Sequence, residues 1–173
     1  MTFGSRQKGK RAERDIAAKI QAWWRQVEPG CVYKPTPSSG GWASKDARGE
    51  FKTAGDLVTT AKRYPWTTEV KNREQWSVER FFEGNTSPVW GWWEQTVRQA
   101  KEEGREPMLF FRKNREPWRV MTDGREGRLK DFGHVVLSPV SAVVGLNLPD
   151  HRVRVFGWDA LERLDPYHFA TGA

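Results

Sequence analysis

Two carboxylates and a lysine stand at a spacing that could support metal-dependent chemistry. Residues 56–60 and 67–71 have strand-forming composition, and the short connection between them predicts a hairpin. A symmetric hairpin would place Asp56, at the start of the first segment, directly opposite Glu69 on the second. Side chains alternate along a strand, so Lys71 should share the face of Glu69. We therefore expect these three charged groups to converge on one patch.

Two carboxylates that face each other repel, and they destabilise a sheet unless a cation lies between them. Ligand oxygens alone favour Mg²⁺, with Mn²⁺ as a substitute. A metal held by Asp56 and Glu69 could activate water for phosphodiester hydrolysis, while Lys71 could orient that water or stabilise the developing charge. Each motif also has an ordinary explanation, because Glu-x-Lys on a strand usually means two solvated residues and Gly-Asp is common in turns. The combination and its order favour a catalytic site.

A predicted first helix adds a third carboxylate. Apolar residues recur at helical spacing from about Lys10 to Val27, and Glu13 precedes Ile16 by three residues, so it falls on the apolar stripe. A carboxylate there needs a partner, and the same metal, bound directly or through water, would supply one. Arg14 points away from the stripe and is free to meet a phosphate. A surface Glu–Arg pair remains the alternative.

Further elements are predicted along the chain. A loop rich in Pro, Ser and Gly runs from Pro35 to about Ala54, and a second helix spans about residues 90–100 before Gly104. A second hairpin joins residues 108–112 and 118–122, and a late strand precedes a short terminal helix that Asp159 could cap. This order predicts an α/β fold with a mixed central β-sheet flanked by helices.

Composition favours a polyanionic partner. The 173 residues carry a formal charge of +7, and they suit a single domain spanning 1–173. We expect the basic N-terminal run to contact the DNA backbone, although a solvated arm is the common alternative. Its residues are Arg6, Lys8, Lys10, Arg11 and Arg14. We expect no small-molecule substrate.

The lone Cys31 excludes an internal disulfide and a zinc site with several thiolates. The chain shows neither a signal peptide nor a membrane span, so we expect a cytoplasmic, soluble protein. Ten tryptophans are unusual for this length, and the cluster Trp90, Trp92 and Trp93 is interpreted as core or dimer interface more readily than as a base-stacking platform.

Four stretches together resemble a known family. They are Gly9-Lys-Arg-Ala-Glu13-Arg14, Ser39-Gly40-Gly41, Gly55-Asp56-Leu57-Val58 and Thr68-Glu69-Val70-Lys71. In this set the sequence resembles the PD-(D/E)xK nuclease superfamily and, more narrowly, the archaeal-type Holliday junction resolvases. The resemblance covers roughly the first two thirds of the chain, and residues from about 123 to 173 are candidates for a group-specific C-terminal addition.

The resemblance implies a restriction-endonuclease-like arrangement of the central sheet. It also implies a homodimer that cuts four-way DNA junctions with Mg²⁺ in DNA recombination and repair. It implies catalytic roles for Glu13, Asp56, Glu69 and Lys71, and it makes Ser39 the loop serine that assists cleavage. Many superfamily members also carry a glutamine on the next helix. Gln95 is the nearest candidate, but it falls opposite the Trp stripe, so we expect little from it. A restriction-like or flap-type nuclease, or an inactive DNA-binding relative, remains the alternative.

Overall fold

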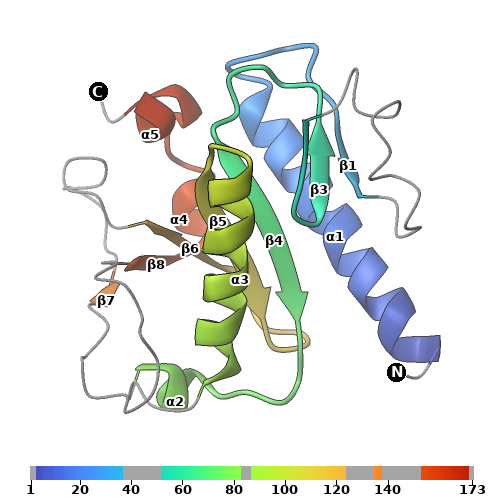
Figure 1. Ribbon diagram of the computed structural model, residues 1–173, viewed down its shortest axis with the longest axis vertical. Coiled ribbons are helices and arrows are strands. Elements are labelled where there is room, and N and C mark those ends of the chain that lie inside the picture. Colours follow the sequence, from blue (N-terminus) through green and yellow to red (C-terminus); the bar gives the residue numbers. More distant parts are fainter. Residues whose placement is uncertain (1–2, 37–51, 83–86, 124–134, 138–152, 172–173) are drawn as a thin grey trace.

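The computed structural model describes residues 3–36, 52–82, 87–123, 135–137 and 153–171 (Figure 1). In chain order its elements are α1 (Phe3–Trp24), β1 (Tyr33–Pro35), β2 (Lys52–Ala54), β3 (Leu57–Thr59), β4 (Trp66–Asn72), α2 (Val78–Phe82), α3 (Pro88–Glu102), β5 (Glu106–Arg112), β6 (Arg119–Asp123), β7 (Val135–Leu137), β8 (Val153–Gly157), α4 (Trp158–Leu161) and α5 (Pro166–Thr171). No helix in these described ranges is long and apolar enough to cross a membrane.

The main sheet has five strands in the order β4-β5-β6-β8-β7. Strands β4 and β5 run parallel, because α3 carries the chain back across the sheet between them, and the other neighbours are antiparallel. A smaller antiparallel sheet has the order β1-β3-β2. The expected α/β class, with a mixed sheet flanked by helices, is confirmed.

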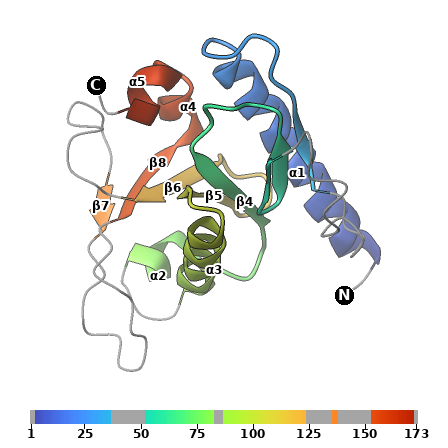
Figure 2. The same cartoon turned by 45° about the horizontal axis from the view of Figure 1, so that its top comes forward.

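Helices cover both faces of the main sheet (Figure 2). Phe110 of β5 packs in one apolar cluster with Ile16 of α1, whereas Leu109 and Phe111 pack in another with Trp93 of α3. This alternation follows from the two-residue period of a strand buried on both faces. Strand β4 lies at one edge of this sandwich, with α1 on one side and α3 on the other.

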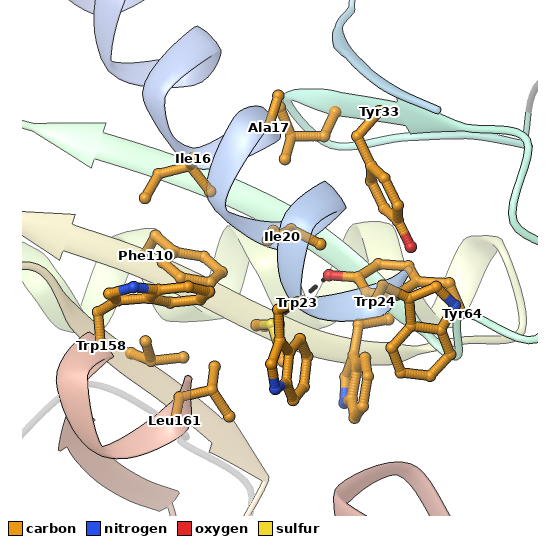
Figure 3. Packing of buried hydrophobic residues seen from close by; sticks show 14 of the residues in the cluster. Ile16, Ala17, Ile20, Trp23, Trp24, Tyr33, Tyr64, Phe110, Trp158 and Leu161 are labelled. Atoms are coloured by element: carbon orange, nitrogen blue, oxygen red, sulfur yellow. Dashed lines mark hydrogen bonds between the residues drawn. The ribbon is translucent and has the colours of Figure 1, made fainter. Parts of the chain in front are cut away.

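Most tryptophans fill the core. In Figure 3, Trp24 of α1 lies beside Tyr64, and their ring centroids are 5.3 Å apart. The indole of the neighbouring Trp23 donates a 2.9 Å hydrogen bond to the Leu164 carbonyl. Eight of the nine tryptophans in the described ranges are buried, and Trp92 is partly buried. The cluster on α3 is therefore core. Of the two interpretations favoured from sequence, core and dimer interface, this burial supports the first for Trp90 and Trp93.

The predicted hairpin between residues 56–60 and 67–71 is wrong. Strand β3 pairs antiparallel with β1 and β2, and the described contact with β4 is a parallel bridge between Gly55 and Thr68. The chain does not turn directly back after β3. It first passes the end of α1, where the Glu28 carboxylate accepts hydrogen bonds from the backbone amides of Lys62 and Arg63 at 2.9 and 3.0 Å.

The C-terminal elements extend the same sheet and core. Strand β8 pairs with β6, and Phe156, Trp158 and Phe169 join the cluster under α1. The predicted cap is wrong, because Gly157 is the N-cap of α4 and Asp159 lies inside its first turn. At α5 the Asp165 carboxylate accepts hydrogen bonds from the first backbone amides instead.

Candidate active site

The free edge of β4 positions Asp56. Its backbone amide donates to the Thr68 carbonyl at 2.9 Å, and its carboxylate accepts a 2.9 Å hydrogen bond from the Val70 amide. This close approach needs Gly55, which has φ of +69° and would place a Cβ 2.3 Å from the Thr68 oxygen. Glycine thus lets the Asp56 segment lie directly against the strand that carries Glu69.

Four polar side chains converge beside this edge. Glu69 is only 2 % exposed, and its carboxyl group lies beside that of Asp56. The Lys71 ammonium pairs with Glu69 Oε1. The same oxygen accepts a 3.0 Å hydrogen bond from Gln95 Nε2 on α3. The site therefore joins the small sheet, β4 and α3.

Burial of the two carboxylates makes their ionisation unfavourable. Burial and the neighbouring Asp56 raise the pKa of Glu69 to about 7, against the opposing effect of Lys71. The pKa of Asp56 is also raised, chiefly by burial. Glu13 on α1 is half-buried, and burial followed by the charge of Asp56 raises its pKa, while Lys10, Lys71 and Arg14 oppose the shift. Three carboxylates therefore influence one another in this region.

The Asp56–Glu69 pair fits a divalent cation. Both groups offer hard oxygen ligands, and a cation between them would relieve the repulsion between their negative charges. Within the described ranges, no set of three or more His, Cys, Asp or Glu residues is close enough to hold a metal together. The pair is thus the candidate for direct ligation, and Glu13 is placed to act at longer range.

The structure brings together most of the residues chosen from sequence. Asp56, Glu69 and Lys71 meet, although through the parallel bridge rather than the expected hairpin, and Glu13 lies within electrostatic range. Ser39 and the side chain of Arg6 lie outside the described residues.

The basic run lies on α1. Lys10, Arg11 and Arg14 are exposed, whereas Lys8 forms an ion pair with Glu74.

Gln95 lies closer to the candidate site than expected from sequence. It does face away from the buried Trp stripe of α3, but that flank of the helix meets the site at the edge strand, where its amide contacts Glu69. A core-facing stripe identifies only one flank of a helix. The sequence signal that pointed to Gln95 was the glutamine that many superfamily members carry on this helix.

Comparison with known proteins supports the family suggested by these residues. A solved structure of Archaeoglobus fulgidus Hjc, a Holliday junction resolvase from an archaeal hyperthermophile, is similar at 22 % identity over 65 % of this chain and 74 % of that chain, with a TM-score of 0.35. No curated protein matches the chain significantly. The model of a family described as "Phage putative PDDEXK endonuclease" matches residues 4–167, which include every described site residue and the C-terminal elements through the start of α5. The chain therefore belongs to this PDDEXK endonuclease family, with the restriction-endonuclease-like α/β fold expected of it.

Proposed function

We propose that the protein is a Mg²⁺-dependent endonuclease that hydrolyses DNA phosphodiester bonds at the Asp56–Glu69 pair. The observation that carries this proposal is the proximity of the buried Glu69 carboxylate to the partly buried Asp56 carboxylate, with Lys71 and Gln95 on the same Glu69 oxygen. PDDEXK nucleases generally use divalent metals, and the oxygen-only pair favours Mg²⁺ with Mn²⁺ as a substitute.

Each residue has a distinct part in this scheme. Asp56 and Glu69 hold the metal, which when bound supplies an activated water and neutralises phosphate charge. Lys71 shares the Glu69 oxygen, so its ammonium can stabilise the negative charge that develops on the phosphate. Gln95 fixes the orientation of the Glu69 carboxylate, and its amide can align the attacking water. Glu13, at longer range on α1, would help to hold the metal through water.

The substrate is proposed to be duplex DNA with a four-way branch, cut by a homodimer. The Glu13-Arg14 pair at the site edge supports this finer assignment, because it is the motif that narrows the sequence resemblance to junction resolvases. Exposed Lys10, Arg11 and Arg14 provide cations for the DNA backbone. Paired symmetric cuts need two sites related by a two-fold axis.

Two charge-neutral variants test the chemistry. Asp56→Asn and Glu69→Gln keep the shape of each side chain, so we expect folded proteins that bind DNA with nearly wild-type affinity but show no Mg²⁺-dependent cleavage. Glu102→Gln at the exposed end of α3 is the control and should cleave normally. Wild-type cleavage by both site variants, or loss of activity in the control, would refute the assignment.

A separate competition tests branch selectivity. Equal amounts of a four-way junction and a linear duplex of the same sequence are offered with Mg²⁺ and competitor DNA. We expect symmetric nicks near the branch, little duplex cutting and a dimer by light scattering. Comparable cutting of both substrates by a monomer would remove the junction assignment and leave a general PDDEXK endonuclease.

A further inference from the structure

A basic groove lies along the flank of α1 that faces away from the catalytic carboxylates. It has a volume of about 900 Å³ and is bounded by the N-terminal half of α1, the end of β4 and the turn after β5, which lies beside the tip of β4 in Figure 1. Its lining carries five positive side chains, namely Lys8, Arg11, Arg14, Arg112 and Arg115, against one negative side chain, Asp15. The groove is thus a concentration of positive charge at a concave surface.

Packing holds the inner part of the groove in place. The Arg112 guanidinium lies 4.1 Å from the centre of the Trp118 ring, and its Nη2 is 3.8 Å from the Asp15 carboxylate. Trp118 Nε1 donates a 2.8 Å hydrogen bond to that carboxylate. The single negative charge of the lining is therefore engaged by neighbours, and Arg112 has a fixed orientation.

Two buried polar atoms of the groove residues lack partners. Among the described residues, neither Arg112 Nε nor Asn72 Oδ1 makes a hydrogen bond. Buried polar groups are normally satisfied, so such atoms in a groove lining are consistent with a ligand or water that completes their hydrogen bonding. Asn72 follows Lys71 on β4, and its register partner Arg112 follows Phe111 on β5. This part of the groove therefore lies next to the strand ends at the site.

The outer rim presents cations that are available for binding. Arg115 lies in the turn after β5 with φ of +67°, and this turn is closed by a 3.0 Å hydrogen bond from the Glu116 amide to the Lys113 carbonyl. In the described part of the chain, exposed Arg115 and exposed Arg11 form no ion pair. Lys8 is less available, because it already pairs with Glu74.

The groove and the catalytic pair lie on opposite flanks of one helix. Glu13 and Asp15 are two residues apart on α1, which separates them by roughly 160° around the helix axis. A helix with its side chains is about 10–12 Å across, close to the ~12 Å width of the DNA major groove. A duplex that places one phosphate at Asp56 and Glu69 can therefore bring other phosphates to the far flank of α1.

We propose that this groove binds backbone phosphates of the DNA substrate away from the bond that is cut. Arg, Asn and Gln side chains are the usual partners of phosphate oxygens, and Arg112, Asn72 and Gln7 supply them here. The inference rests on the proposed function and names a second contact tract for the same substrate. Because it acts on binding, it should change substrate affinity and salt dependence without changing the chemical step.

The test compares the double variant Arg11→Gln, Arg115→Asn with wild type and with Arg25→Gln. Asn tolerates the positive φ at position 115. Arg25 is an exposed cation just beyond the other end of α1, about 20 Å from Arg11 along the helix. Binding to a duplex and to a four-way junction is measured with EDTA over a range of salt concentrations, alongside kcat and KM with Mg²⁺. Thermal unfolding checks that each variant is folded.

The double variant should reduce the slope of log K against log salt by about 2, since each lost phosphate contact removes about 0.9. KM should rise at least tenfold with kcat nearly unchanged, and Arg25→Gln should match wild type. A double variant with wild-type salt slope and KM would overturn the proposal that the groove binds phosphate, while the proposed endonuclease function would stand. Wild-type protein that neither binds nor cuts DNA would instead overturn the proposed function. An equal change in salt slope and KM from Arg25→Gln would mean that any surface cation contributes as much as the groove, and this would also overturn the proposal.

Discussion

Replacing Gly55 with alanine should disrupt the site at its point of assembly. A Cβ at this position would lie 2.3 Å from the Thr68 carbonyl oxygen and 2.9 Å from its carbon, both backbone atoms that cannot rotate away. The φ of +69° adds the left-handed penalty of an L-residue, about 1–2 kcal/mol. Overpacking against fixed atoms costs a further ~1–3 kcal/mol, so the free energy of unfolding should fall by about 2–5 kcal/mol.

Two other glycines separate these contributions. Gly104 has φ of +62° with no atom within 4 Å of an added Cβ, so Gly104→Ala should cost only the conformational part, about 1–2 kcal/mol. Gly91 lies inside α3 and is equally uncrowded, so Gly91→Ala should stabilise the protein by about 0.5–1 kcal/mol. Urea unfolding followed by Trp fluorescence ranks the three variants.

Cleavage adds a second readout to the same series. Relief of the clash must move Gly55 away from β4, and this breaks the hydrogen bonds that Asp56 makes to Thr68 and Val70. Gly55→Ala should therefore lose most cleavage even at temperatures where it is folded, whereas Gly104→Ala and Gly91→Ala should remain active. If the free energies of unfolding of Gly55→Ala and Gly104→Ala agree within about 0.5 kcal/mol and Gly55→Ala cleaves normally, the close approach of the two strands is not required for the site.

Three further outcomes follow from the carboxylate pair. Because the pKa of Glu69 is raised from 4.5 to about 7 in the folded state, its contribution to stability is complete below pH 4.5 and is lost as pH rises to about 7. Urea titrations in EDTA should therefore show that the free energy of unfolding falls by about 3 kcal/mol over this range, and Glu69→Gln should abolish the fall. A wild-type free energy of unfolding that does not change with pH would contradict the burial argument. Mg²⁺ competes with protons for these two carboxylates, whose pKa values are raised, so the rise in melting temperature that it produces should be larger at pH 8 than at pH 5.5. An equal rise at both values would argue against ligation by this pair. Gln95→Ala should lower kcat about tenfold or more with little change in DNA affinity, while Gln99→Ala, one turn further along α3, should not; equal kcat in both variants would remove Gln95 from the site.

The sequence by itself determined the candidate residues of the site and most of the elements that carry them. Apolar spacing predicted the helices α1 and α3. Two strand-forming segments on either side of a short turn-forming segment predicted the hairpin of β5 and β6. The order of Glu13, Asp56, Glu69 and Lys71 pointed to the family that the comparison with residues 4–167 supports. Candidate metal-binding residues can be recognised in a sequence because few residue types can bind a metal.

Only the tertiary structure decided how these residues meet. Equal spacing from a turn predicted opposite positions on a hairpin, yet Asp56 reaches Glu69 through the parallel approach of Gly55 to Thr68, since β3 has its antiparallel partners elsewhere. The contact of Gln95 depends on which flank of α3 lies over the edge strand, and the basic groove depends on the turn after β5 folding beside α1. Strand partners and helix flanks are set by long-range packing, and no local pattern of residues specifies them.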